Sequence, residues 1–217
     1  MRGTIDLNSF NSKAFSIKIL VFLVGIFTVQ IGVGLFIQSN VGLDSYTIIM
    51  TGISILLGIT VGQANILVMT VLFVFILCFA REYIRIGTFL STFITGIFLD
   101  TINESLTIFG ISDMTYITRL LILILGCVII SIGFAILTAP ELSVSPLDQM
   151  PLIIVDRTRF TYSQIRIVQD ILFISTGYLL GGTLGLGTIL AIFLIGPCIQ
   201  FTMKHLGEPL KKKLNTL

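Results

Sequence analysis

Eight apolar runs, separated by short polar stretches, make up most of the chain. The runs are Ile17–Gln38, Tyr46–Leu57, Ile66–Ala80, Ile86–Ile102, Ile117–Leu137, Leu147–Val155, Ile167–Leu180 and Leu186–Met203. A membrane-spanning helix needs about 20 residues, with about 17 as a practical minimum. Only the second and sixth runs fall short once the polar residues that begin the third and seventh are included. The pattern therefore predicts an all-α membrane protein with six transmembrane helices and two short helices.

Composition supports this class of protein. Of the 217 residues, 55% are hydrophobic and 11% are charged, whereas soluble domains average about 25% charged. So few charged residues could not form the polar surface of a soluble domain of this size. The sequence also shows no strong basic patch, so we do not expect the protein to bind nucleic acid. The three cysteines lie in apolar runs without metal-binding spacing, and the single histidine, His205, lies in a basic tail. We therefore expect no metal, no cofactor and no enzymatic activity, because the usual catalytic sets are missing.

The basic residues predict the orientation of the spans. If neither short run crosses the membrane and the N-terminus is cytoplasmic, Arg119 is the only one of the 13 Lys and Arg residues placed outside. Basic residues concentrate in cytoplasmic loops. Charge alone would equally allow both short runs to cross, but the sixth is too short to do so. We expect both termini to be cytoplasmic, in a bacterial cytoplasmic membrane.

The two halves of the chain resemble each other. At an offset of about 100 residues, Thr60 matches Thr161 and Gly96 matches Gly196, and the order of long and short runs is the same in both halves. Three spans per half would insert the halves in opposite orientations, an inverted-topology repeat common in transporters. The expected parts are a cytoplasmic segment at 1–16, a first membrane repeat at 17–102, an extracellular connection at 103–116, a second repeat at 117–203 and a basic cytoplasmic tail at 204–217.

The short runs start with residues that favour helix N-termini. In the second half Ser145 can cap the helix, Pro146 suits its first position and Asp148 faces the positive end of the helix dipole. Asp44 is the expected cap in the first half, followed by Ser45 and Thr47. If both starts enter the membrane from opposite sides, they would form a site for an anion or a polar solute. Alternatively, both short helices lie at the membrane interface.

Further polar residues complete the candidate binding site. Arg166 and Asp170 stand one helical turn apart and form either an ion pair or a solute contact. Gln63 and Gln164 occupy equivalent positions and line a pathway or join helices by hydrogen bonds. The candidate substrate-binding residues are Asp44, Ser45, Thr47, Gln63, Ser145, Asp148, Gln164, Arg166 and Asp170. Asp100 is expected at an extracellular helix end.

Glycine- and proline-based motifs across residues 20–203 resemble a known family. They include Gly32-x-Gly34, Gly42-Leu43-x-Ser45, Gly52-Ile53-Ser54, the Gly58–Gly62 turn, Ile86-Gly87-Thr88, Gly96-Ile97-Phe98-Leu99-Asp100, Ser145-Pro146-Leu147-Asp148, Leu186-Gly187-Thr188 and Gly196-Pro197. Together they look like the YczE/YyaS/YitT-type small bacterial membrane proteins. That family's short-segment motif resembles G-x-x-P-x-D. The second half keeps its Pro146 and Asp148, whereas the first half has Ser45 and Thr47 in those places. The resemblance implies a bacterial cytoplasmic-membrane protein without indicating a substrate.

Two functions fit these observations. The first is a transporter or channel for a small polar solute or ion, with its site at the ends of the two short helices. The second is a non-transporting membrane protein that stabilises or regulates another membrane complex, for which the interior should be dry and tightly packed. The expected partners are the lipid bilayer and either a solute, a second copy of the chain or another membrane protein.

Overall fold

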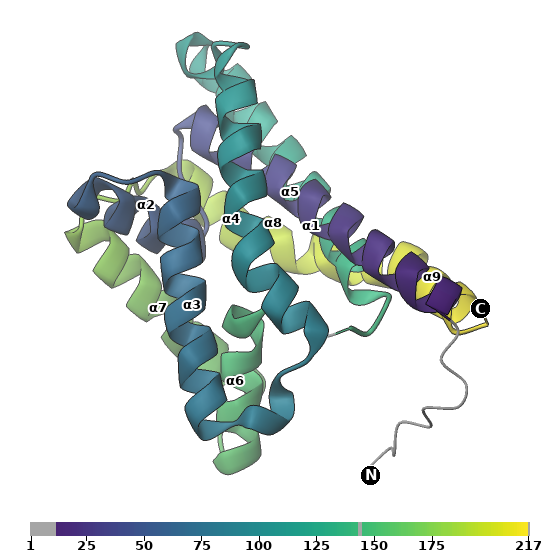
Figure 1. The fold of residues 1–217 in the computed structure, drawn as a ribbon. Helices are drawn as coiled ribbons and strands as arrows, with labels where there is room; N and C mark the ends of the chain where they lie inside the picture. The colour runs from purple at the N-terminus through teal and green to yellow at the C-terminus, as the bar shows by residue number, and fades with distance from the viewer. Residues whose placement is uncertain (1–11, 143–144, 217) are drawn as a thin grey trace.

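In the computed structural model, residues 12–142 and 145–216 are described, and this part of the chain is helical with no β-strand. The main helices are α1 (Ser12–Ser39), α2 (Ser45–Leu57), α3 (Val61–Phe79), α4 (Ile86–Thr107), α5 (Tyr116–Thr138), α6 (Pro146–Arg157), α7 (Tyr162–Leu179), α8 (Leu186–Thr202) and α9 (Glu208–Asn215). Short helical turns lie at η2 (Arg81–Tyr83), η3 (Ile111–Asp113) and the π-helical η4 (Met203–Gly207). Figure 1 shows their arrangement. The predicted all-α class is confirmed.

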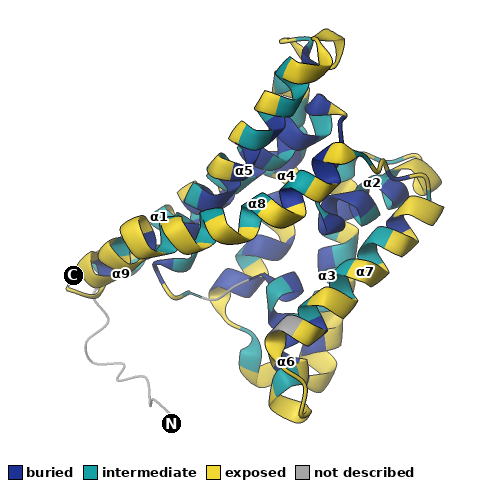
Figure 2. Ribbon diagram, turned by 180° about the vertical axis from the view of Figure 1, so that it is seen from behind, coloured by how far each residue is buried: buried dark blue, intermediate teal, exposed yellow. Residues whose placement is uncertain are grey.

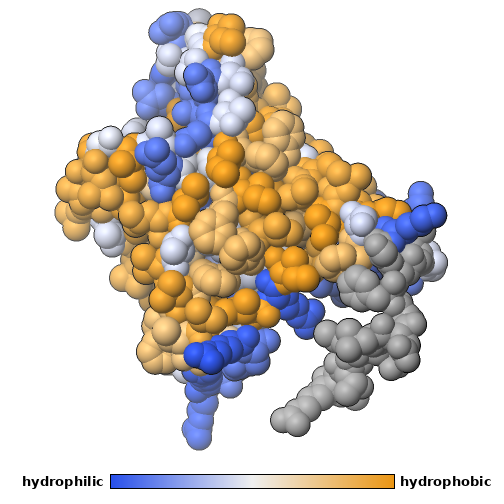
Figure 3. Space-filling view, viewed as in Figure 1, coloured by the Kyte–Doolittle hydropathy of each residue, from blue (hydrophilic) through white to orange (hydrophobic). Residues whose placement is uncertain are grey.

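Five helices in the described part of the chain are long and apolar enough to cross a membrane. They are Lys13–Ser39, Val61–Phe79, Ile86–Thr107, Tyr116–Thr138 and Leu186–Asn215. The expected sixth span, α7, has 18 residues but carries Arg166 and Asp170, which lower its hydropathy, and it is not among them. Hydrophobic residues cover most of the visible waist of the molecule, and hydrophilic residues gather at its upper and lower ends (Figure 3). This distribution is typical of a multi-pass membrane protein.

The two short helices begin as their sequences predict. Asp44 caps α2 by accepting a hydrogen bond from the Thr47 backbone N–H at 3.3 Å. Ser145 caps α6 by accepting from the Asp148 N–H at 3.4 Å, with Pro146 in the first helical turn. These caps satisfy N–H groups that have no partner inside the helix. With 13 and 12 residues, both helices are about 20 Å long or less, too short to cross a bilayer.

Helices α1 and α5 form the centre of the molecule and pack closely along their lengths. Glycines make this approach possible. A Cβ on Gly25 of α1 would lie 2.5 Å from the Cα of Leu137, and one on Gly133 of α5 would lie 2.6 Å from the backbone N of Val29. Figure 2 shows the buried residues concentrated where α1, α4 and α5 meet, while the outer faces of α1, α7 and α8 show many exposed residues. Exposed apolar residues on these outer faces suit contact with lipid.

The two halves of the chain bind each other through matched loops. The Gly87 N–H at the start of α4 donates to the Leu142 carbonyl at 3.4 Å, and the Gly187 N–H at the start of α8 donates to the Val41 carbonyl at 2.9 Å. In each case the loop after the first long helix of one half bonds to the last long helix of the other half. Helix contacts are also exchanged, because α2 packs on α7 and α6 packs on α3.

The backbone repeats a rare conformation at the same place in both loops. Asn40 and Glu141 are the non-glycine residues with positive φ in the described chain, at 47° and 56°. Each follows the end of its long central helix by a residue or a few. Their spacing equals the offset that matches Thr60 with Thr161 in the sequence.

The described chain begins and ends on the same side of the molecule. Lys18 Nζ, near the start of α1, donates to Asn215 Oδ1 of α9 at 3.2 Å. Lys211 of α9 also pairs with Glu141, which follows α5, at 2.6 Å. The start of α1, the end of α5 and α9 therefore lie together, as Figure 1 shows at the right of the molecule. Helices α1 and α5 consequently run antiparallel.

Candidate functional site

A partly open cavity of about 540 Å³ is lined by residues from α1 to α8. Much of its wall is apolar, including Val33 of α1, Met50 of α2, Met69 of α3 and Phe134 of α5. Its size falls within the range of about 300–1,000 Å³ that is usual for small-molecule sites. Apolar walls with a few polar groups are also usual for such sites, so the polar residues of the cavity are the ones that could give it chemical selectivity.

The N-termini of both short helices reach this cavity. Asp44, Ser45 and Thr47 line it from the start of α2, and Ser145 and Asp148 line it from the start of α6. The structure therefore brings together at one cavity five candidate residues from two segments about 100 positions apart. Their meeting at one cavity depends on the exchange of the loops between the two halves.

An ion-pair network on α7 joins the two helix starts. Arg166 Nη1 lies 3.2 Å from Asp148 Oδ1, and Arg166 Nε lies 3.7 Å from Asp170 Oδ1. Ser45 Oγ donates to Asp170 Oδ1 at 2.5 Å, and Ser145 Oγ donates to Asp148 Oδ2 at 2.8 Å. The connection thus runs from α2 through Asp170 and Arg166 to α6. The predicted ion pair between Arg166 and Asp170 is present, and both residues line the cavity.

The charged side chains of this network are partly accessible. The relative exposures are 33% for Arg166, 24% for Asp148 and 35% for Asp170. An ion pair with this exposure is weaker than a fully buried one because water still screens it. A solute could therefore replace water at these carboxylates without first disrupting a fully buried ion pair.

Gln63 and Gln164 do not line the cavity. Each is the third residue of its helix, and its side-chain oxygen accepts from the backbone N–H of the capping threonine, Thr60 or Thr161, at 3.1 and 3.0 Å. The threonine hydroxyls accept from the glutamine N–H groups in return. These are capping boxes, which satisfy two free N–H groups at a helix start. Both glutamines are exposed helix-capping residues, so their matched positions reflect matched helix starts.

Asp100 lies inside α4 and joins it to the start of α3. Its Oδ2 accepts from Thr60 Oγ1 at 2.5 Å, and its Oδ1 accepts from the Gly62 N–H at 2.8 Å. The sequence predicted Asp100 at a helix end, whereas the structure places it about two turns before α4 ends at Thr107, because its carboxylate binds the start of the neighbouring α3. The matched position in the second half is Gln200, which is exposed.

Four polar residues of the cavity wall were missed by the sequence analysis, namely Gln30, Asn65, Ser91 and Thr95. Asn65 Oδ1 accepts from Tyr46 OH and from Thr95 Oγ1, each at 3.4 Å. Gln30 is 6% exposed, and its Oε1 has no hydrogen-bond partner in the described structure. An amide in the middle of an apolar span was the signal that could have identified Gln30, since polar groups inside membranes are costly.

Of the two solutes expected at the helix starts, an anion or a polar solute, the charge of the cavity disfavours the anion. The backbone N–H groups of Thr47 and Asp148 already donate to the capping residues Asp44 and Ser145. The lining also contains three aspartates and one arginine. An added anion would face this excess of carboxylates, so the cavity does not suit it. Within residues 12–142 and 145–216, no three or more His, Cys, Asp or Glu residues are grouped to hold a metal ion.

Comparisons with known proteins agree with the membrane class. The chain is 28% identical over 190 residues to the uncharacterized protein YyaS of Bacillus subtilis, covering 86% of this chain and 92% of the relative. It is 25% identical over 183 residues to the uncharacterized membrane protein YczE of the same organism, covering 84% and 83% of the two chains. An uncharacterized protein of Haemophilus influenzae is 27% identical over 195 residues, covering 89% and 85%. No solved structure matches the chain.

A family model covers most of the chain. It is described as a family of unknown function, DUF6198, and it matches residues 16–204. The matched region includes all of α2 to α8, and therefore both short helices and the whole cavity lining. The resemblance to YczE/YyaS-type membrane proteins seen in the glycine and proline motifs is confirmed, and the chain belongs to the DUF6198 family.

Proposed function

We propose that this protein is a transporter or channel for a small polar solute or ion in the bacterial cytoplasmic membrane, and not an enzyme. The observation that carries the proposal is the cavity at which the N-termini of α2 and α6 meet a charged network on α7. Two short helices whose starts meet inside a membrane protein are typical of solute sites in secondary transporters. The placement of both starts at one cavity lined by residues of all the long helices favours re-entrant helices over helices lying at the interface.

Six spans in two inverted repeats are part of this proposal. In α7, Arg166 and Asp170 face the cavity instead of lipid, which is how charged residues are usually placed in a spanning helix. The contact between Lys18 and Asn215 joins the two ends of the chain on one side, as an even number of crossings requires. The matched capping boxes and the exchanged loop contacts support equivalent halves.

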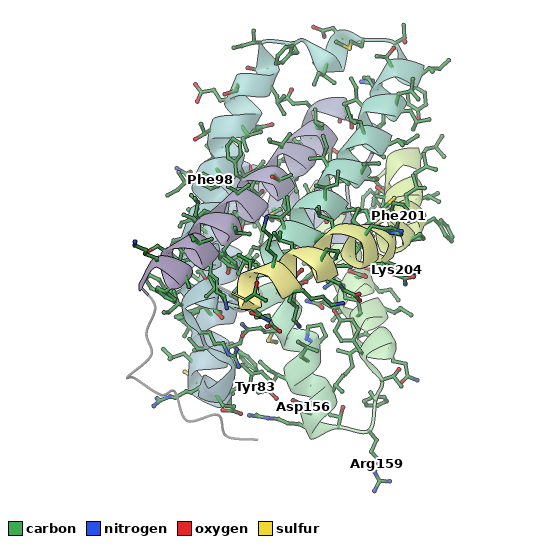
Figure 4. The ribbon with its side chains drawn as sticks, turned by 90° about the vertical axis from the view of Figure 1, so that its right-hand side faces the viewer. Tyr83, Phe98, Asp156, Arg159, Phe201 and Lys204 are labelled. Atoms are coloured by element: carbon green, nitrogen blue, oxygen red, sulfur yellow. The ribbon has the colours of Figure 1, made fainter. Side chains whose placement is uncertain are left out.

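The orientation in the membrane is inferred from the basic residues at the end of the molecule where η2 and the end of α6 meet. Tyr83 donates a hydrogen bond to Asp156 there, joining η2 to the end of α6, and Arg159 projects beyond them (Figure 4). Arg157 of the same end pairs with Glu82 at 3.5 Å. Because basic residues concentrate in cytoplasmic loops, we assign this end and both chain termini to the cytoplasm.

A difference between the halves supports alternating access. Helices α3 and α4 pack together closely, with the Gly62 carbonyl against Gly96. Helices α7 and α8 lack comparable packing, although Tyr162, Arg166 and Ile192 from these helices all line the cavity. In inverted-repeat transporters, two halves that adopt different arrangements can exchange them, which moves access from one side of the membrane to the other.

The second function considered, a non-transporting membrane partner, predicts a dry and tightly packed interior. A cavity of about 540 Å³ with charged residues in its wall favours the transporter. The basic tail was the partner surface considered for that role, and in the structure its Lys211 pairs with Glu141 of the same chain. No specific contact of the described chain points to a partner protein.

Cysteine accessibility tests the proposal. Single cysteines replace Asp44 or Asp148 in a variant lacking Cys78, Cys127 and Cys198, and proteoliposomes are treated with a membrane-impermeant thiol reagent. We expect both positions to react, because water fills a solute cavity. A cysteine at Leu123, which is fully buried in the α1–α5 core, is the matched control and should stay protected. Protection at positions 44 and 148 in a folded protein would favour the packed membrane partner.

A further inference from the structure

The formal charge of the cavity selects the kind of solute. The ionisable lining residues include the carboxylates of Asp44, Asp148 and Asp170 and the guanidinium of Arg166. The guanidinium is used within the protein, because its Nη1 and Nε face Asp148 and Asp170. The lining therefore carries two more formal negative than positive charges, and its one cation is not free to bind an anionic solute.

A second observation, independent of the carboxylates, points to a hydrogen-bond donor. Gln30 lies in the middle of α1, is 6% exposed and lines the cavity. Its carbonyl oxygen, Oε1, is buried and accepts no hydrogen bond within the described structure, so the side-chain amide must turn toward the cavity for this oxygen to meet a solute. An amide oxygen buried without a donor is costly, and the cost is removed when a ligand supplies an N–H or O–H group.

The rest of the wall defines the body of the solute. Met50, Met69, Phe134 and Leu137 give apolar surface within the same cavity. A bare inorganic ion would leave most of about 540 Å³ unfilled and this apolar surface unused. A quaternary ammonium would be attracted by the carboxylates, but it has no N–H group for Gln30.

We propose that the cavity binds a protonated amine with a small apolar body. Its N–H groups donate to the carboxylate oxygens of the cavity and, once the Gln30 amide turns toward them, to Gln30 Oε1. Its apolar part packs against the methionine and phenylalanine side chains. This inference rests on the proposed function in that it uses the same cavity. It goes further by assigning positive charge, hydrogen-bond donors and an apolar body to the solute.

Four probes of similar size test each part of this assignment on the full-length protein in nanodiscs. They are benzylammonium, benzyltrimethylammonium, benzyl alcohol and benzoate, and their binding is measured by calorimetry with empty nanodiscs as the reference. We expect benzylammonium to bind at least tenfold more tightly than the neutral alcohol and the anion. We also expect benzyltrimethylammonium to bind more weakly than benzylammonium, because it has a charge but no N–H donor.

Variants locate the binding. Gln30→Leu should weaken benzylammonium about fivefold to tenfold, the usual effect of one lost hydrogen bond, and should change benzyltrimethylammonium little. Asp148→Asn and Asp170→Asn should each weaken both cations by about tenfold. Gln200→Leu and Asp113→Asn are the matched controls, since both residues lie outside the cavity lining, and neither should change binding. The four-probe series on the unaltered protein remains decisive if a variant fails to fold.

The results of these experiments can contradict the amine assignment and the transport function independently. Benzoate binding most tightly, all probes binding equally, or no binding by benzylammonium up to about 10 mM would overturn the amine assignment. Binding of the amine without movement into proteoliposomes would support the assignment and contradict transport. Movement of an anion or a neutral solute through the cavity would support transport and contradict the amine.

Discussion

Gly96 and Gly196 occupy matched positions in the two halves of the chain but have opposite surroundings. A Cβ on Gly96 would lie 2.3 Å from the carbonyl oxygen of Gly62, whereas one on Gly196 would have no described atom within 4 Å. Gly96 lies where α3 and α4 touch. Gly196 belongs to α8, which packs less closely against α7, and it lines the cavity. This pair shows most directly where the two halves differ.

Alanine at these two positions should have different effects. Gly96→Ala forces α3 and α4 apart, because neither the added carbon nor the Gly62 backbone can move aside, and should cost roughly 1–3 kcal/mol of stability. Gly196→Ala should change stability by less than about 0.5 kcal/mol, or raise it slightly through helix propensity. Thermal unfolding in detergent measures both. Equal losses would show that the two helix pairs are packed alike.

Removing Arg166 should destabilise the protein more than removing either of its partners. Arg166→Gln leaves Asp148 and Asp170 facing each other without a compensating charge, and we expect a loss of about 1–2 kcal/mol given the partial exposure of all three residues. Asp148→Asn in the same chain should recover part of this loss. Chemical unfolding of the two single variants and the double variant measures the coupling. An additive double variant would contradict a network that acts as one unit.

The threonines that cap α3 and α7 should differ in importance. Both take part in capping boxes, but only Thr60 also donates to Asp100 on α4. Thr161→Val should cost about 1 kcal/mol for the lost cap. Thr60→Val should cost about 1 kcal/mol more, because it also leaves a carboxylate oxygen without its donor. Thermal unfolding of the two variants side by side tests this, and a larger loss for Thr161→Val would contradict the role given to Asp100.

The contact between α9 and the end of α5 should weaken in acid. Hydrogen bonds from Lys211 and then Asn215 lower the pKa of Glu141 below its ordinary value of 4.5. The charged form is thus favoured in the folded protein, so its stabilisation is fully present above pH 4.5 and is lost as the pH falls through the lowered pKa. Both side chains are about half exposed, so the contribution should be under about 1 kcal/mol.

Glu141→Gln should remove this pH-dependent part of the stability and leave the value in acid nearly unchanged. The comparison requires unfolding curves of both proteins between about pH 3 and pH 7, which covers the titration of a carboxylate with a lowered pKa. Glu104→Gln in the last turn of α4 is the control for a general charge effect. Parallel curves for Glu141→Gln and the unaltered protein would show that Glu141 is not paired in solution.

Local signals made much of the fold predictable. Asp44, Ser145 and Pro146 mark helix starts by short-range chemistry, and run lengths identified α2 and α6 as short helices. The use of matched polar residues was harder to predict. Gln63 and Gln164 were predicted to line a pathway or to join helices by hydrogen bonds, because helix capping produces the same matched positions in the sequence. Gln30 was hidden inside an apolar run, and its place at the cavity depends on how α1 packs against helices distant in the sequence.

The loop contacts between the two halves can form only in a fixed order during synthesis of the chain. The Gly87 N–H at the start of α4 donates to the Leu142 carbonyl, and Leu142 is synthesised 55 residues after Gly87. This hydrogen bond therefore cannot form until the second half is being made. The Gly187 N–H donates to the Val41 carbonyl, which is already present when Gly187 is synthesised. The first half therefore enters the membrane as an incomplete unit, and expressing residues 1–116 alone should give a product that membrane proteases degrade. Co-expression with the remaining chain should rescue it, as expected for two fragments that complete each other.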